Sequence, residues 1–467
     1  MRIFLSVCAG LFLSACTVGP QYKHPEMELP DRYSLLAPVS KASRSDLHWW
    51  RDFNDPVLNQ LIGAGTQGNL SVAEARERVE EAEALVRRDS ATPSGDGTVS
   101  GRRNSNGANT GSVELEAEIG LAGRTQWASR AARQRLDAAR LGEGEALRLL
   151  LSELSKTYMQ MRFLQRSYQT RQQDLASRQR TLRDLRTQLD AGAATQLDVL
   201  RARALVSETQ TEMPGTQAEI IQQRNRISTL LGQPVGQLGI DLGYKGGQPL
   251  PVVGGDLGVP ADLLRARPDI RIAERRYAAA VSDMGVAQAS RYPSLTLSGL
   301  VTAPLSGGAW NESLLAGLTV PVFSQPALAA SADAAESRAR QAYLQWRKSV
   351  LDAVEEVETA LAALQAARQA VGSARELVSL NERSLDLSRR LIVEGGDATV
   401  LDVIDRERSL SAARFTLART IRDLAMAYID LRVALGIGHD AVIDDTGLVT
   451  RDDVARAAGG LIASLQE

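Results

Sequence analysis

Two short turns in the sequence, each with a threonine and an aspartate three residues apart, carry its most readable local chemistry. Thr195 and Asp198 form the first pair, and Thr399 and Asp402 form the second. At a helix start, a threonine hydroxyl accepts a hydrogen bond from the third helical N–H, and an acidic side chain at that third position bonds back to the threonine N–H. The spacing therefore predicts a capping box at the start of two helices, with Asp where Glu or Gln is usual.

The second of these helices also carries a row of side chains that the first lacks. Leu401, Asp405 and Arg408 fall at positions i, i+4 and i+7, which lie on one helix face. The matching positions of the first helix hold a leucine, Arg201 and an alanine. Asp405 and Arg408 either form a solvated ion pair worth about 0.3 kcal/mol or meet charged groups brought to them by assembly. The residues alone leave both interpretations open.

Groups that would support catalysis or metal binding are sparse. His24, His48 and His439 lie far apart, and the sequence contains no His-Glu-x-x-His, Gly-x-Ser-x-Gly or phosphate-binding Gly-Lys-Ser/Thr motif. The 54 basic residues face 56 acidic ones, for a net charge of -2, so there is no basic excess to neutralise phosphates. These features argue against an enzyme, a metal site, a cofactor and a nucleic-acid partner.

The N-terminus has the features of an export signal. Arg2 is followed by an apolar stretch over 3–13 and by the small residues Ser14 and Ala15 before Cys16. This pattern resembles a bacterial lipobox, which implies a signal peptide over 1–15, a diacylated Cys16 and sorting to the outer membrane. Two acyl chains anchor a protein stably where one binds marginally. An ordinary signal peptide with an incidental cysteine is the alternative.

The chain is internally duplicated. Thr195, Leu197, Asp198 and Val199 recur as Thr399, Leu401, Asp402 and Val403 (399 − 195 = 204), and Leu231-Gly232 recurs as Leu435-Gly436. Upstream, Ala73, Glu74, Arg76 and Val86 recur as Ala273, Glu274, Arg276 and Val286 (273 − 73 = 200). Self-similarity at a fixed offset indicates a repeated structural unit.

Each copy predicts a helix, a β-hairpin, a very long helix, a turn and a returning helix. In the first copy, apolar residues at helical spacing cover 66–90, and strict alternation with glutamates marks a strand over 112–121 paired with 97–106. The second copy offers strands over 293–303 and 312–322. Long helices follow over 124–190 and 327–393, with bends expected at Gly142, Gly144 and Pro214. The strict alternation along the strands is typical of a half-buried sheet or of a bilayer-spanning barrel. In a membrane, about four strands per chain cannot close a barrel, whose smallest known examples have about eight, so several chains would have to share one.

Together, these features resemble the TolC-like outer-membrane factors of tripartite pumps, and more closely their lipoprotein branch. The residues that carry the resemblance are the lipobox, Trp49-Trp50 with Phe53-Asn54-Asp55-Pro56, Leu263 to Ile270, Tyr292-Pro293-Ser294 and both Thr-x-Leu-Asp-Val turns. The sequence departs from the family at Gly120 and Ala122, where Asp and Phe are usual, and only 4% of its residues are aromatic.

The resemblance implies a mainly α fold with β: a homotrimer whose four strands per chain form a twelve-stranded β-barrel, continuous with a long periplasmic α-helical barrel. The implied parts are a lipidated equatorial segment over 16–65, a first repeat over 66–232 with its hairpin at 97–121, an equatorial segment over 233–260, a second repeat over 261–436 with its hairpin at 293–322, and a C-terminal equatorial segment over 437–467.

The implied function is an outer-membrane exit duct that passes small molecules from a periplasmic adaptor and an inner-membrane transporter of the resistance-nodulation-division (RND) type. The alternatives are the duct of an ABC-driven type I secretion system and a non-conducting periplasmic scaffold lipoprotein. By the same resemblance, Leu401 and Asp405, with Arg408 nearby, form rings that constrict the periplasmic end. The aspartates of the capped turns then either cap helices or line the duct mouth.

Overall fold

The computed structural model describes residues 18–27, 48–91, 94–103, 109–244, 246–252, 267–305, 307–394 and 399–438. The predicted signal peptide, Cys16, and most of the C-terminal segment lie outside these ranges. The chain divides into two compact units, one of Met1–Glu28, Ala75–Glu143 and Pro268–Leu351, the other of Leu29–Glu74, Gly144–Arg267 and Asp352–Glu467. Each unit draws on both copies of the repeat. Among the described residues, no helix is both long and apolar enough to cross a membrane.

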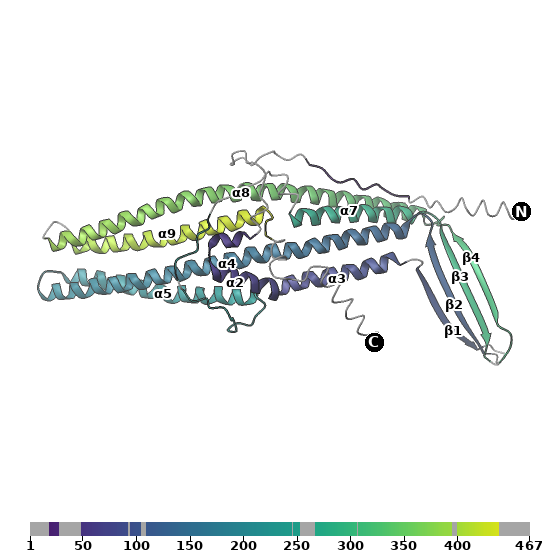
Figure 1. Cartoon of the computed structure of the whole chain (residues 1–467), viewed down its shortest axis with the longest axis horizontal. Helices are drawn as coiled ribbons and strands as arrows, with labels where there is room; N and C mark the ends of the chain where they lie inside the picture. The colour runs from purple at the N-terminus through teal and green to yellow at the C-terminus, as the bar shows by residue number, and fades with distance from the viewer. Residues whose placement is uncertain are drawn as a thin grey trace. The chain divides into compact units, whose positions relative to one another are not determined.

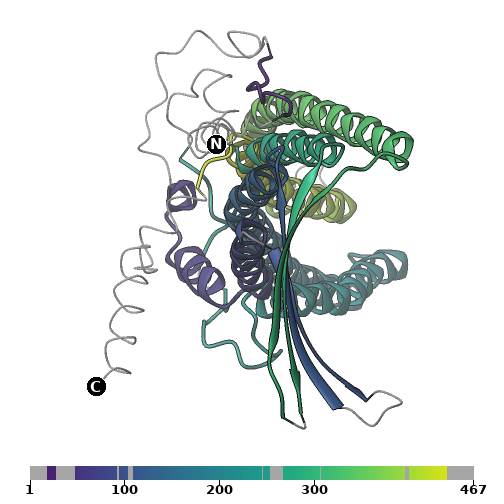
Figure 2. The same ribbon diagram turned by 90° about the vertical axis from the view of Figure 1, so that its right-hand side faces the viewer.

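The strands of the first unit form one antiparallel sheet in the order β1-β2-β3-β4 (Figures 1 and 2). The strands are β1 (Ser94–Arg103), β2 (Asn109–Gly120), β3 (Ser294–Pro304) and β4 (Asn311–Thr319). The first hairpin therefore begins three residues earlier than the sequence predicted. The reason is register, because Ser94 pairs with Glu118 near the far end of β2.

Alternation along the strands gives the sheet two chemically different faces. Glu116 lies opposite Asp96 on β1 and Ser298 on β3, whereas Leu115 lies opposite Gly97 and Gly299. Successive side chains point to opposite faces of a strand. One face therefore carries the acidic residues, and the other carries mainly leucine, valine, alanine and glycine, with Arg103 at the end of β1 and Glu312 near the start of β4.

Two very long helices follow the hairpins. These are α4 (Arg124–Asp190, 67 residues) and α8 (Gln325–Val393, 69 residues), each about 100 Å long at 1.5 Å per residue. Both match the predicted bounds to within two residues. The returning helices are α5 (Gln196–Leu230) and α9 (Val400–Ala434), and α5 is one helix with Pro214 inside it. The helix α7 (Pro268–Ala289) precedes β3.

The predicted helix over 66–90 is instead two helices, α2 (Pro56–Gly68) and α3 (Leu70–Ser90). Asn69 separates them because its side chain is used twice. Its Oδ1 accepts a hydrogen bond from the Val72 N–H at 3.0 Å, and its Nδ2 donates to the Leu230 carbonyl at 2.8 Å. Asn69 thus starts α3 and at the same time bonds the end of α5.

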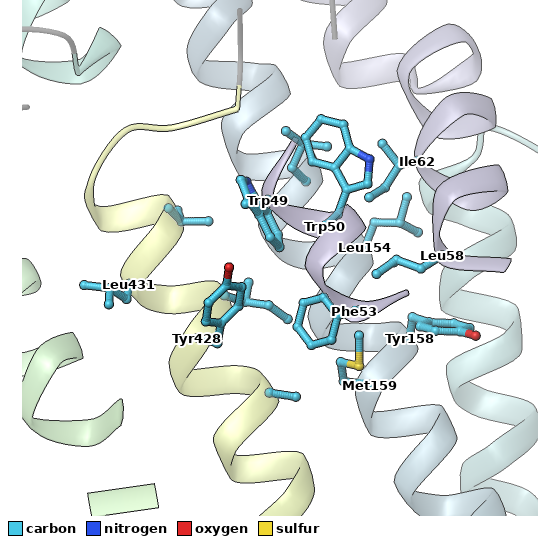
Figure 3. Close-up of a cluster of buried hydrophobic side chains, with 14 of the residues drawn as sticks. Trp49, Trp50, Phe53, Leu58, Ile62, Leu154, Tyr158, Met159, Tyr428 and Leu431 are labelled. Carbon is cyan, nitrogen blue, oxygen red and sulfur yellow. The ribbon is translucent and has the colours of Figure 1, made fainter. Parts of the chain in front are cut away.

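The main core of the second unit packs around the short 3-10 helix η2 (Trp49–Phe53) and α2 (Figure 3). Trp49, Trp50 and Phe53 are buried among side chains of α4 and α9, including Leu154 and Leu431. A second, smaller core joins α4 to α5 near the turns through Leu182, Leu185, Val199, Ala202 and Leu205. Trp49 and Trp50 therefore form part of the core in which η2 packs against α4 and α9.

Candidate functional site

Both predicted turns form reciprocal capping boxes at the starts of α5 and α9. Thr195 donates from its backbone N–H (3.1 Å) and its hydroxyl (2.6 Å) to Asp198 Oδ2, and accepts from the Asp198 N–H at 3.2 Å. Thr399 and Asp402 repeat the pattern at 2.8, 2.7 and 3.3 Å. The hydroxyl and then the backbone N–H of each threonine lower the pKa of its aspartate.

Loss of the first cap should cost stability without changing the helix faces. We expect Asp198→Ala to lower the free energy of unfolding by about 1 kcal/mol or less per chain, because the carboxylate is only partly buried. A carboxyl whose folded-state pKa is lowered stabilises the fold above its unfolded pKa, and this contribution is lost as pH falls through the lowered value. The difference between wild type and Asp198→Ala in thermal unfolding should therefore be full above about pH 4 and shrink below it. A difference that grows on acidification contradicts the cap.

The predicted gate residues lie on the exposed face of α9. Leu401 is 39% exposed, and Asp405 and Arg408 are exposed as well. Arg408 lies 3.9 Å from Glu208 on α5. Among the described residues, the Asp405 carboxylate forms no hydrogen bond or ion pair, so the i, i+3 pair between Asp405 and Arg408 is absent.

A buried carboxylate on another side of α9 was missed by the sequence reasoning. Glu407 Oε1 accepts hydrogen bonds from Arg389 on α8 (2.8 Å) and from Ser177 (3.0 Å) and Thr181 (3.1 Å) on α4. One turn further along, the Ser411 hydroxyl donates to Asp174 of α4 at 2.5 Å. These contacts tie the second hairpin to α4 just inside the turns.

The sequence around Glu407 indicates only weakly that this residue is buried. Val403 and Leu410 lie four residues before it and three after it, so it falls on the apolar face of an amphipathic helix. Its partners on α4 are more than 220 residues away in sequence, and no local pattern names them.

Comparison with known proteins gives the family of this chain. The profile described as "Outer membrane efflux protein" matches residues 64–233 and 259–437. The chain belongs to the outer membrane efflux protein family. Each matched range covers one copy of the duplicated unit, so the family's structural unit is the repeat found in the sequence.

The relatives of this efflux-family chain extend over almost its whole length. Nodulation protein T of Rhizobium leguminosarum bv. trifolii is 34% identical over 93% of this chain and 97% of its own length. The cation efflux system protein CusC of Escherichia coli (strain K12) is 29% identical over 93% of this chain and 99% of its own length.

Solved structures of such channels share the fold. The outer-membrane channel OprN aligns with a TM-score of 0.80 at 28% identity, covering 91% of this chain and all of its own. A structure of CusC aligns with a TM-score of 0.76 at 26% identity, covering 90% of this chain and 99% of its own. The predicted resemblance and mainly α fold class are confirmed, and as a member of a family of efflux channels the chain is not an enzyme.

The sheet of this efflux-family chain supplies a second group of charged residues. Its polar face carries four acidic residues, Asp96, Glu114, Glu116 and Glu118. On that face of the described strands, the one basic residue is Arg102. Glu312 lies on the opposite face, because it pairs with Val301, which pairs with Val113. The polar face therefore carries a net charge of about -3 per chain.

Proposed function

We propose that this chain is the exit duct of a tripartite efflux pump in the outer membrane, passing small molecules received from a periplasmic adaptor and an RND-type inner-membrane transporter. The observation that carries the proposal is the open sheet with one apolar and one acidic face. Strands of 9 to 12 residues match the length of tilted strands that cross a bilayer. The apolar face suits lipid, and the polar face suits a water-filled lumen.

The edges of the sheet support a shared barrel. Within the described residues, β1 and β4 each pair along one side only. In a bilayer, an unpaired edge leaves backbone groups without partners, at a cost of several kcal/mol each, so the sheet must close. Three chains supply twelve strands, and a homotrimer is therefore part of the proposal. Light scattering of the detergent-solubilised protein should give the mass of three chains, and a folded monomer would refute closure.

A lipid on Cys16 is also part of the proposal. Cys16 lies outside the described residues, but Val18 accepts a hydrogen bond at 2.8 Å from the indole N–H of Trp127, which follows β2 in the first turn of α4. The Trp127 ring also packs closely against Gly19 and Gly285, because a Cβ added to either glycine would come within about 2.5 Å of the ring. Val18, two residues after Cys16 in the sequence, is thus held beside the residue that follows β2. Mass spectrometry of the mature N-terminus tests the modification.

We propose that the adaptor contacts the capped turns. Between them lies an open hollow of about 620 Å³, lined by Ala193, Ala194, Val400 and Leu401 beside the capping residues. Small and apolar side chains at this position suit contact with a protein partner. Co-purification of the adaptor with wild type but not with Ala194→Arg would support this assignment, and equal recovery would remove it.

The acidic face should make the channel prefer cations. Three chains would place about nine net negative charges around the lumen, and Glu116→Gln removes three of them. We expect planar-bilayer recordings in a KCl gradient to show that the channel prefers cations. Glu116→Gln should lower the logarithm of the cation-to-anion permeability ratio by about a third. Lower salt should enlarge the difference, since screening weakens.

Glu312→Gln is the matched control, because it removes the same charge from the opposite face. It should leave the preference for cations unchanged. Equal effects of the two substitutions would show that the assignment of faces is wrong, and absence of any conductance in the wild-type protein would reject the channel.

A further inference from the structure

Two tyrosine–arginine pairs of the same construction lie on α4 and α9. In each, the arginine follows the tyrosine by four residues, and its Nε donates to the phenolic oxygen: Arg162 to Tyr158 at 2.7 Å and Arg432 to Tyr428 at 2.9 Å. The guanidinium carbons lie 4.9 and 5.0 Å from the ring centroids. All four side chains are buried. Because each hydroxyl accepts from an arginine, its proton is free to be donated elsewhere.

Both hydroxyls donate to aspartates of one short segment. Tyr158 donates to Asp55 Oδ2 at 2.7 Å, and Tyr428 donates to Asp52 Oδ2. Arg432 adds an ion pair with Asp52 at 3.4 Å. Burial, as the largest cause, raises the pKa of both tyrosines well above their ordinary range, so both remain donors. Two aspartates three residues apart thus bind two different long helices.

The segment that carries the aspartates is itself held in place. Trp49 and Phe53 are buried in the core of Figure 3, and Phe53 packs edge-on against the Tyr428 ring at 5.6 Å. Asp55 Oδ1 caps α2 by accepting from the Val57 N–H at 2.8 Å. The Asp52 carbonyl accepts from the Val252 N–H at 2.9 Å. These contacts therefore fix the positions of Asp52 and Asp55, and with them the distance between the two tyrosine contacts.

Further charged contacts hold the end of α9. Arg148 on α4 donates to the Val433 carbonyl at 3.2 Å, and Arg267 donates to the Ala434 carbonyl at 2.7 Å. The equivalent end of α5 is bonded by the neutral amide of Asn69. Hydrogen bonds from charged groups contribute about twice as much as neutral ones. The C-terminal end of α9, which we call its base, is therefore held more firmly than the C-terminal end of α5.

We propose that Asp52 and Asp55 are positioning residues of the duct: they form a crossbar that fixes the base of α9 against α4, so that α9 pivots at Tyr428 when its far end moves. This inference rests on the proposed function, because it assumes that the face with Leu401 and Asp405 moves during opening. From Tyr428 to Asp405 the helix extends about 35 Å, and a rotation of about 5° at the pivot displaces Asp405 by about 3 Å. Small changes at the crossbar are amplified at the gate.

Tyr428→Phe and Tyr158→Phe form a matched pair for the test. Each removes one hydroxyl from one contact and keeps the ring and its stacked arginine. Hydrogen exchange should rise about tenfold in the last two turns of α9 for Tyr428→Phe and in the adjacent turns of α4 for Tyr158→Phe, as expected for a lost hydrogen bond to a charged group. Asp52→Glu, which keeps the negative charge, should show a smaller rise than Asp52→Asn, which keeps an acceptor oxygen but loses the charge.

The functional measurement separates positioning from simple stabilisation. In planar bilayers, Tyr428→Phe should increase the fraction of time spent open about tenfold. Tyr158→Phe should change it less than twofold at a similar loss of thermal stability, because the core around Trp49 and Phe53 still holds the segment beside α4 and the contact with α9 is intact. Equal effects of the two on opening, or no change in opening with Tyr428→Phe despite faster exchange, would overturn the crossbar as a positioning device. If wild type does not conduct, the proposed function fails, and unchanged exchange in both variants would then independently reject the crossbar.

Discussion

Replacing Asp405 by alanine is expected to raise the conductance of the resting channel severalfold with little change in thermal stability. The carboxylate is exposed on α9 and has no partner among the described residues of its own chain, so its removal breaks no contact within the chain. In the proposed trimer, we expect identical faces of α9 to meet around the axis and Asp405 to accept from an arginine of a neighbouring chain. A loss of roughly 1 kcal/mol at each of three interfaces would change the open-to-closed ratio more than a hundredfold.

Single-channel recording of purified protein at moderate salt measures this effect. Arg201→Ala should reproduce it in part if Arg201 is the neighbouring donor. Arg201 is available for this role, since the ion pair that it forms among the described residues is a long one of 3.9 Å to Asp198. Asp198→Ala serves as the control because it should lower stability and leave conductance unchanged. An unaltered conductance for Asp405→Ala would reject the gate.

Gly232→Ala is expected to be among the most destabilising single substitutions in the second unit. Gly232 has φ +67° at the end of α5, where a side chain costs about 1–2 kcal/mol. An added Cβ would also stand 2.1 Å from the backbone carbonyl oxygen of Gly68. Backbone cannot rotate away as a side chain can, so the end of α2 would have to move. We expect a total loss of about 3 kcal/mol or more.

The duplicated sequence provides the control at Gly436, the equivalent residue of the second copy. Its φ is +70°, but the Cβ would meet the Cγ atom of Arg267 at 2.7 Å, which belongs to a side chain. Gly436→Ala should therefore lower the midpoint of thermal unfolding, but by less than Gly232→Ala does. The reverse order would show that the close approach to Gly68 does not determine the cost.

The sequence by itself determined the features that depend on neighbours within a few residues. The bounds of α4 and α8, the two β-hairpins and the two capping boxes all follow from periodicity or from side chains three residues apart. The duplication adds to this, because each copy repeats the same local signals. Such hydrogen bonds and amphipathic patterns form wherever the chain folds locally, so a single sequence is enough to predict them.

Only the tertiary structure decided which distant residues share a contact. Asn69 interrupts the predicted helix because the end of α5, 161 residues away, accepts its amide. Arg408 approaches Glu208 instead of Asp405, and Glu407 is buried against α4. Asp52, one of the two aspartates of the crossbar, accepts a hydrogen bond from Tyr428, which lies 376 residues away in the sequence. Long-range partners depend on how whole helices pack, and a periodic sequence leaves several equivalent ways to place one helix against the next.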